Sequence, residues 1–167
     1  MEPKLKIPAS FTRSAEISYC GNYRYVLGRT WDDQKDRLMY VGLNPSTADA
    51  LQEDPTIRKC LHFAYQEGFG GFDILNIYAF RTPYPEELFK AQDPIGPKNA
   101  SFLKKYMEQS SKVALMWGTE AHKHEAVQAF LSMHAGPWYC FGENKDGSPR
   151  HVLYIPARER MRQLEIR

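Results

Sequence analysis

The segment Gly42-Leu43-Asn44-Pro45-Ser46-Thr47 is where the residue types most clearly suggest chemistry. It follows the apolar run 38–41 and precedes a helix start at Asp54-Pro55, which predicts a tight turn between a strand and a helix. Such a turn places the Asn44 amide at the carboxyl edge of a sheet, where open α/β sheets bind ligands. It also exposes backbone N–H groups that can hold an anion or an ordered water. The alternative is a purely structural turn, because Asn and Pro are ordinary turn residues.

Polar side chains follow three further apolar runs of the chain. If these runs are parallel strands, their carboxyl ends meet at one edge of the sheet, and the polar residues share a site. The candidate residues are Asn44, Ser46, Thr47, Asp49, Asn76, Tyr78, Arg81, Trp117, Thr119, Glu120, Lys145, Ser148, Arg150 and His151. Few of them are carboxylates, which argues against the acid pair of sugar glycosidases. The glycine-rich phosphate loops and the nucleophile elbow are also missing from the sequence.

The cysteines and histidines do not predict a metal site. Cys20, Cys60 and Cys140 stand far apart and form no paired motif. Four of the five histidines fall on predicted helices, without the spacing that would put two ligands on one helix face. His151 differs because it follows a Ser-Pro-Arg loop, and we expect it in the site. The sequence therefore predicts neither a metal nor a cofactor.

The amino-acid composition is typical of a soluble protein with a single domain. The 167 residues are 43% hydrophobic and 25% charged, values typical of a soluble globular chain that forms one domain. The net charge of +2 permits nucleic-acid binding through a local patch without requiring it. The first residues lack an apolar signal core, and no run is long enough to span a bilayer, so we expect a cytoplasmic protein with no membrane partner.

The predicted elements alternate between strands and helices. Strands are expected at 23–31, 37–43, 72–78, 113–118 and 138–142, with a short extended piece at 151–155. Helices are expected to begin at Asp54-Pro55 and Pro97, and a third carries an apolar stripe over 127–134. This alternation predicts an α/β domain over residues 1–167 with a mainly parallel sheet. Residues 1–18 are expected to form a loose arm, and the first two strands an antiparallel hairpin at the sheet edge.

The chain resembles an uncharacterised bacterial and phage family, known as domain-of-unknown-function family sixteen-forty-three. The resemblance covers nearly the whole chain but implies no activity. One departure is Val152, where the family pattern has Pro. The matching segments are Leu43-Asn44-Pro45-Ser46-Thr47-Ala48-Asp49-Ala50, Asp54-Pro55-Thr56-Ile57-Arg58-Lys59-Cys60, Asp93-Pro94-Ile95-Gly96-Pro97-Lys98-Asn99, Trp117-Gly118 and Asp146-Gly147-Ser148-Pro149-Arg150-His151.

A more distant resemblance is to the uracil-DNA glycosylase superfamily. Gly42-Leu43-Asn44-Pro45 is similar to its Gly-x-Asn-Pro turn, and Ile74-Leu75-Asn76 to its strand ending in Asn. Ser148-Pro149-Arg150-His151 contains the residue types of its late His-Pro-Ser loop in another order. The resemblance implies a three-layer α/β sandwich with a central four-stranded, mainly parallel sheet, to which the N-terminal hairpin strand adds.

The same resemblance implies hydrolysis of the N-glycosidic bond between base and sugar. Asn44 would hold the attacking water, and Asn76 would read a pyrimidine edge. Apart from the resemblance, Asp49 or Glu53 in the segment after the turn could position a water. His151 or Arg150 would stabilise the anionic base. The remaining substrate-binding candidates are Ser46, Thr47, Tyr78 as part of a stacking wall, Arg81 as a phosphate contact, and Ser148.

Two other functions stay open on the sequence. One is a non-catalytic module that binds nucleic acid, a nucleotide or a modified base on the same fold. The other is a transferase that modifies nucleotides or bases, because fold does not determine function. The expected partner in each case is a nucleic acid or a nucleotide.

Overall fold

The computed structural model describes residues 4–46, 51 and 53–166. The strands of this part of the chain are β1 (Thr12–Ile17), β2 (Arg24–Thr30), β3 (Arg37–Gly42), β4 (Gly71–Asn76), β5 (Lys112–Leu115), β6 (Trp138–Cys140) and β7 (Arg162–Leu164). The α-helices are α1 (Pro55–Gln66), α2 (Pro85–Leu88), α3 (Asn99–Gln109) and α4 (Glu125–Leu131). The 3-10 helices are η1 (Glu120–Lys123) and η2 (Val152–Tyr154).

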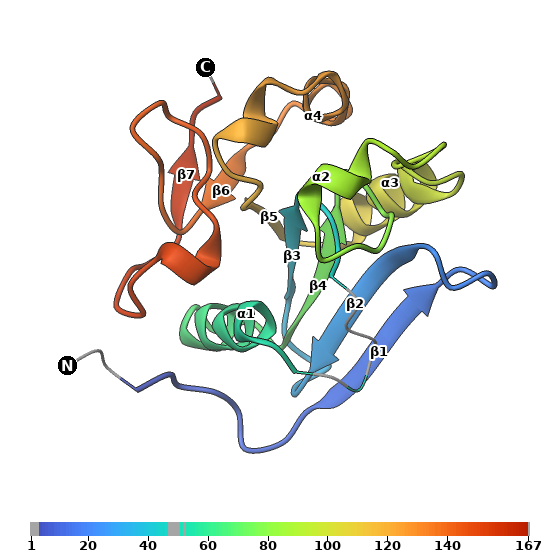
Figure 1. Ribbon diagram of the computed structural model, residues 1–167. Coiled ribbons are helices and arrows are strands. Elements are labelled where there is room, and N and C mark those ends of the chain that lie inside the picture. The colour runs from blue at the N-terminus through green and yellow to red at the C-terminus, as the bar shows by residue number, and fades with distance from the viewer. Residues whose placement is uncertain (1–3, 47–50, 52, 167) are drawn as a thin grey trace.

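The strands form one mixed sheet in the order β1-β2-β4-β3-β5-β6-β7 (Figure 1). Pairs β1·β2, β2·β4 and β6·β7 are antiparallel, whereas β3·β4, β3·β5 and β5·β6 are parallel. The prediction of a central four-stranded, mainly parallel sheet is therefore wrong. Antiparallel strands extend the sheet at both edges, and two of them, β1 and β7, lie in segments where the sequence pattern did not indicate a strand.

The predicted hairpin between the first two strands is also wrong, because β4 lies between β2 and β3. Gly70 makes this insertion possible. Its carbonyl accepts hydrogen bonds from the Trp31 and Asp32 N–H groups, both at 2.9 Å, and its own N–H donates to the Asp36 carbonyl at 2.9 Å. A side chain at position 70 would collide with the Asp32 backbone, so the chain can enter between the two strands only at a glycine.

An ion pair then holds β4 against β3. The Arg37 guanidinium donates to both carboxylate oxygens of Asp73, at 3.0 Å each, and also to the Phe72 carbonyl. This bidentate geometry is the strongest form of the Arg–carboxylate contact. These side-chain contacts therefore pair β3 with β4, which is distant in sequence, although the short connection 31–36 joins β3 to β2.

The start of α1 is confirmed as predicted. Asp54 is the N-cap, and its side-chain oxygen accepts a hydrogen bond from the Ile57 N–H at 2.8 Å, while Pro55 occupies the first turn. The apolar stripe of Ile57, Cys60 and Leu61 faces the sheet and is buried. The direction of the chain after β3 is thus set by a local signal.

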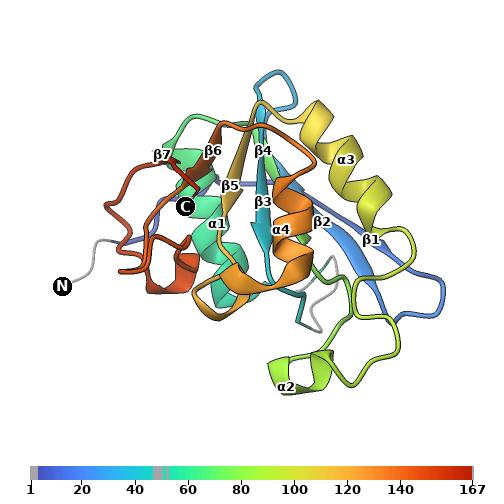
Figure 2. The same cartoon turned by 90° about the horizontal axis from the view of Figure 1, so that it is seen from above.

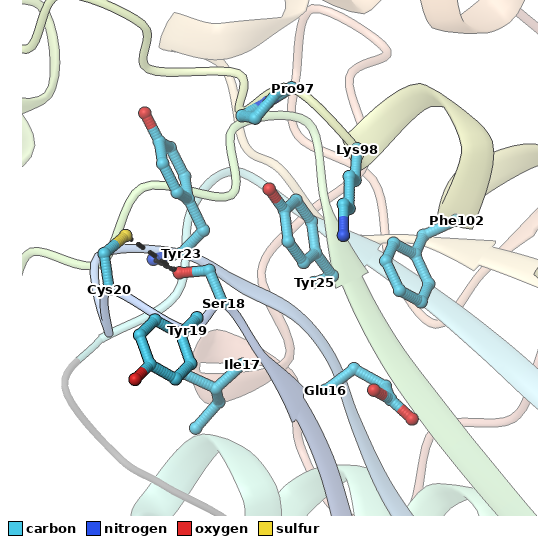
Figure 3. Close-up of a pocket in the computed structure, with 10 residues that line it drawn as sticks. All are labelled: Glu16, Ile17, Ser18, Tyr19, Cys20, Tyr23, Tyr25, Pro97, Lys98 and Phe102. Atoms are coloured by element: carbon cyan, nitrogen blue, oxygen red, sulfur yellow. Dashed lines mark hydrogen bonds between the residues drawn. The ribbon is translucent and has the colours of Figure 1, made fainter.

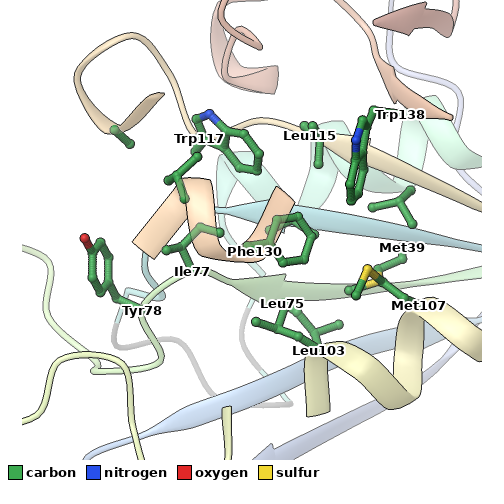
Figure 4. Close-up of a cluster of buried hydrophobic side chains, with 14 of the residues drawn as sticks. Met39, Leu75, Ile77, Tyr78, Leu103, Met107, Leu115, Trp117, Phe130 and Trp138 are labelled. Atoms are coloured by element: carbon green, nitrogen blue, oxygen red, sulfur yellow. The ribbon is translucent and has the colours of Figure 1, made fainter. Parts of the chain in front are cut away.

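Helices cover both faces of the sheet, with α1 on one side and α3 and α4 on the other (Figure 2). The α1 face packs Tyr40, Phe63 and Phe72. On the opposite face, Leu75 and Phe130 belong to a second buried cluster (Figure 4). Each strand of the centre is therefore buried on both sides, as its continuous apolar sequence predicts.

Two smaller segments differ from expectation. The extended piece expected at 151–155 contains the 3-10 helix η2, and α2 occupies part of the proline-rich loop that follows β4. Within the described ranges, no helix combines the length and the apolar content needed to cross a membrane.

Candidate functional site

A cleft with a volume of about 730 Å³ opens at the carboxyl edge of the parallel strands. It runs across the sheet from Arg24 on β2, past Asn76 on β4 and Gly42 on β3, to Met116 after β5 and His151 before η2. Clefts of this size accommodate small organic ligands and cofactors. The other lining residues are Leu43, Asn44, Pro45, Ser46, Asp54, Thr56, Ile57, Ile74, Pro83, Pro85, Trp117, Gly118, Thr119, Glu120, Leu153 and Tyr154.

Asn44 lies in the turn after β3 and is held by its amide nitrogen. Its Nδ2 donates to the Pro45 carbonyl at 3.1 Å and to the Thr82 carbonyl at 3.0 Å. Both amide hydrogens are thus used, and the Oδ1 atom remains to accept a hydrogen bond from a water or a ligand. Ser46 lines the cleft beside it, whereas Thr47 and Asp49, the other predicted residues of this turn, lie outside the described residues.

Asn76 ends β4 on the floor of the cleft and is 4% exposed. Its Nδ2 atom is buried and has no hydrogen-bond partner among the described residues. Leaving a buried donor unsatisfied costs roughly 1–3 kcal/mol, and native proteins rarely tolerate it without a water, a ligand or a functional reason. The Asn99 amide supports this strand end by donating to the Asn76 and Ile77 carbonyls at 2.8 and 3.1 Å. Asn99 thus anchors the strand end, and Asn76 lines the cleft with an Nδ2 atom that is shielded from solvent.

His151 lies at the opposite end of the cleft as the N-cap of η2. Its Nδ1 accepts a hydrogen bond from the Leu153 N–H at 3.2 Å, which assigns the ring proton to Nε2 in the neutral form. Burial lowers the pKa of His151 below its usual value, and the Asp54 carboxylate offsets part of that effect. The imidazole is therefore a neutral donor through Nε2 at neutral pH.

Arg24 is a cleft residue that sequence reasoning missed. It is 5% exposed, and burial lowers the pKa of its guanidinium to about 10, while Asp54 acts in the opposite direction. A guanidinium with this pKa is still charged at neutral pH. The available signal is an arginine between Tyr23 and Tyr25 at the start of an otherwise apolar strand, where a buried charge requires a reason.

Tyr154 is a second missed residue. It is 67% exposed at the mouth of the cleft, and its ring centroid lies 6.1 Å from that of His151. An exposed aromatic ring at the mouth of a cleft is suited to stacking on a planar ligand. The sequence predicts a short extended piece at 151–155, which gives no sign of the outward orientation that η2 gives to this side chain.

Two predicted residues of the β4 end do not line the cleft. Tyr78 is 5% exposed, and its hydroxyl forms a hydrogen bond with His124 Nδ1 at 3.0 Å. Arg81 donates from Nη1 to the Gly21 carbonyl at 3.1 Å, so it reaches toward the β1–β2 turn. Tyr78 thus contributes to packing around α4, and Arg81 to the connection between the β4 loop and that turn.

In the loop before η2, the predicted residues Ser148 and Arg150 point to different places. Ser148 is fully buried and joins Asp146, Asn144 and Thr119 through its hydroxyl, at 2.6, 3.0 and 3.2 Å. Arg150 lines a separate small cavity of about 110 Å³. Ser148 therefore shapes the loop that presents His151, and Arg150 lies away from the cleft.

A second cavity of about 440 Å³ lies between the β1–β2 turn and the start of α3 (Figure 3). Three of its aromatic rings form a ladder, because Tyr23 stacks on Tyr25 at 6.0 Å and Tyr25 on Phe102 at 4.9 Å. The exposed thiol of Cys20 lies at its edge, 3.3 Å from the Ser18 hydroxyl. The buried unpaired amide of Asn76 belongs to the larger cleft, which we therefore treat as the candidate site.

A family model matches the part of the chain that contains the cleft. Residues 24–153 match the family model described as "Protein of unknown function (DUF1643)", and the chain belongs to this family. The match begins at Arg24 and ends at Leu153, so it spans almost every residue that lines the cleft. No curated protein and no solved structure gave a match to the chain.

Proposed function

We propose that the cleft binds a nucleotide unit of DNA or a modified nucleotide and hydrolyses its N-glycosidic bond. The observation that carries this proposal is the buried Asn76 Nδ2, which has no partner among the described residues and belongs to the floor of a cleft that also contains Asn44 and His151. A carboxamide offers an adjacent donor and acceptor, which is the pattern that a pyrimidine edge complements.

The order of the motifs gives independent support. A Gly-x-Asn-Pro turn, a strand ending in Asn and a late loop with His follow one another at Asn44, Asn76 and His151. This order resembles the uracil-DNA glycosylase superfamily, and we propose the likeness for the site alone, since the sheet differs from the one expected.

The proposed reaction assigns one role to each group. The bond between C1′ and the base nitrogen breaks, and the electron pair leaves with the base. The water oxygen bonds to C1′, one water proton ends on the base, and the other stays on the new hydroxyl. Asn44 Oδ1 orients the water, Asn76 binds the base edge, and the Nε2–H of neutral His151 stabilises the negative charge that develops on the base.

An active-site amide limits the rate of this reaction. Asn44 can orient a water but cannot take its proton as a carboxylate does. We therefore expect slow turnover, or turnover of a base that is already a good leaving group.

The test is the release of free base from mismatched and modified DNAs and from modified nucleotides, measured by mass spectrometry. Asn44→Ala and His151→Ala should abolish product formation and leave the fold intact by circular dichroism. His134→Ala is the matched control, because the Nδ1 of this exposed histidine also accepts a backbone N–H two residues later, from Gly136 at 2.7 Å. Unchanged release in both site variants would contradict the assignment.

A non-catalytic binding module is the second candidate, and the amide at position 44 is the observation that favours it. Both Asn44 amide hydrogens bind backbone carbonyls, so the side chain is a fixed acceptor suited to binding. This function predicts ligand binding without turnover, and loss of binding in Asn76→Ala. Equal affinity of Asn76→Ala and the parent chain across a nucleotide panel would exclude it.

A further inference from the structure

The charges around the cleft distinguish a DNA substrate from a free nucleotide. Proteins that bind DNA neutralise several phosphates with Lys and Arg, and most of their non-specific affinity comes from these contacts. A glycosylase acting on DNA thus needs basic residues around the mouth through which the base enters.

The solvent-exposed part of the described lining contains no such basic residue. It consists of Pro83, Pro85, Thr119, Glu120, Leu153 and Tyr154. Arg81, expected as a phosphate contact, and Arg150, expected to stabilise the anionic base, are directed elsewhere. Arg81 donates to the Gly21 carbonyl, and Arg150 lines the separate small cavity behind the loop.

One guanidinium lies inside the cleft instead, together with the Asp54 carboxylate, which favours its charged form. Among the described lining residues, Arg24 is the sole Lys or Arg, and it is 5% exposed at the β2 end. A guanidinium has five N–H donors, so it can hold phosphate oxygens in addition to its neighbours in the protein. The low local dielectric around a buried cation strengthens its attraction for an anion.

The dimensions match a single nucleotide. Arg24 is on β2 and Met116 follows β5, three strand positions apart in the order β2-β4-β3-β5, which is roughly 14 Å at about 4.8 Å per strand. Asn76 lies between these ends, and His151 lies beyond Met116. A base placed between Asn76 and His151 would direct its sugar and phosphate toward Arg24.

We infer that the substrate of this cleft is a free nucleotide, whose phosphate binds Arg24, rather than a base turned out of duplex DNA. The inference rests on the proposed function for the orientation of the base. The products of its hydrolysis are the free base and the sugar phosphate.

The test compares ligands that differ by one phosphate. Calorimetry should show that 2′-deoxyuridine 5′-monophosphate and thymidine 5′-monophosphate bind at least about tenfold more tightly than their nucleosides, as expected for a charge-assisted contact. Inorganic phosphate should compete with the monophosphates. Arg24→Gln should remove the preference and leave nucleoside affinity unchanged, and Arg24→Lys should retain part of it. Arg158→Gln, at an exposed position outside the cleft, is the control.

Folding of each variant is checked by its thermal transition, and Arg24→Lys keeps the test valid if Arg24→Gln fails to fold. Equal affinity for nucleoside and monophosphate would overturn the inference. Base release from an oligonucleotide containing deoxyuridine, without release from the monophosphates, would also overturn it and leave the proposed function standing. Absence of base release from every substrate would contradict the proposed function, and the phosphate preference in binding would still decide this inference.

Discussion

Gly42 and Asn76 are direct partners in the parallel register of β3 and β4, and a Cβ atom at position 42 would lie 2.9 Å from the Asn76 Oδ1. Side chains do not approach this closely, so the glycine creates the space in which the Asn76 amide adopts its orientation. The glycine of the Gly-x-Asn-Pro turn thus acts on the next strand as well as on its own turn. This relation explains why a glycine precedes Asn44 by two residues.

Gly42→Ala should displace the Asn76 amide and reduce ligand binding and any product formation. The added methyl group forces local movement in a packed site, which costs about 1–3 kcal/mol of stability. The measurement is the unfolding free energy together with nucleotide affinity. In the double variant Gly42→Ala/Asn76→Ala the amide that obstructs the methyl group is gone, so the cost of the alanine at position 42 should fall. Additive costs would show that the two residues do not interact as described.

Burial of His151 predicts a dependence of stability on pH. Its pKa is lowered in the folded protein, so below the usual value of 6.5 the unfolded chain binds the proton more readily. The contribution of neutral His151 to the free energy of unfolding is therefore fully present above about pH 6.5, and it is lost as the pH falls toward the folded-state pKa. His151→Asn keeps an acceptor for the Leu153 N–H but cannot titrate, and it should flatten this part of the profile.

Urea midpoints measured between about pH 5 and 8 test the role of His151. The exposed His134 provides the matched substitution His134→Asn, which should retain the pH dependence of the parent. A profile of His151→Asn that parallels the parent would show that another group carries the effect.

The sequence predicts the local features of the site better than its long-range ones. The Asp54 N-cap and the turn at Asn44 are encoded by neighbouring residues, and the position of Asn76 follows from the end of its apolar strand. The pairing of β2 with β4 is not visible locally, because it depends on Gly70 and on the Arg37–Asp73 contact across the sheet. Neighbouring strands in sequence pair often but not always.

The contacts of long side chains are also difficult to predict from the sequence. Arg81 is expected to contact a phosphate and Arg150 to stabilise the anionic base, yet each side chain can reach several places, and only the packed structure selects one. Arg24 lies on a strand whose neighbours are apolar, and it faces the cleft because β2 pairs with β4 and so reaches the edge where β3 and β4 end. A pattern of residue types carries no information on this long-range pairing.

The thiols should differ strongly in reactivity. Cys20 is exposed, and hydrogen bonds from the Ser18 hydroxyl and the Asn22 backbone lower its pKa, which raises the thiolate fraction at neutral pH. Burial raises the pKa of Cys60 and Cys140. Iodoacetamide should thus add one label to the folded chain at Cys20, as seen by intact and peptide mass spectrometry. Ser18→Ala should slow this labelling, and labelling of Cys60 at a similar rate would contradict the burial described for α1.

Glu53 joins the chain before α1 to the first two strands. Its Oε1 accepts from Arg13 Nε at 3.0 Å and from Arg29 at 3.1 Å, and the Arg29 side chain is fully buried whereas that of Arg13 is 38% exposed. Glu53→Gln removes the carboxylate from beside a buried guanidinium, and losing this charge-assisted hydrogen bond with a partly exposed partner costs about 1–3 kcal/mol. Arg13→Gln removes a solvent-screened partner and should cost less than about 1 kcal/mol.

Equilibrium unfolding in urea measures the contributions of Glu53 and Arg13, and the ratio between them is the informative result. Because Glu53 directly precedes the Asp54 N-cap, a loosened Glu53 should also weaken ligand binding in the cleft, whereas Arg13→Gln should leave binding unchanged. Similar destabilisation by both variants would show that the buried guanidinium does not depend on this carboxylate. In that case the segment before α1 would be positioned by the N-cap alone, and Asp54→Ala would become the variant with the larger effect on the cleft.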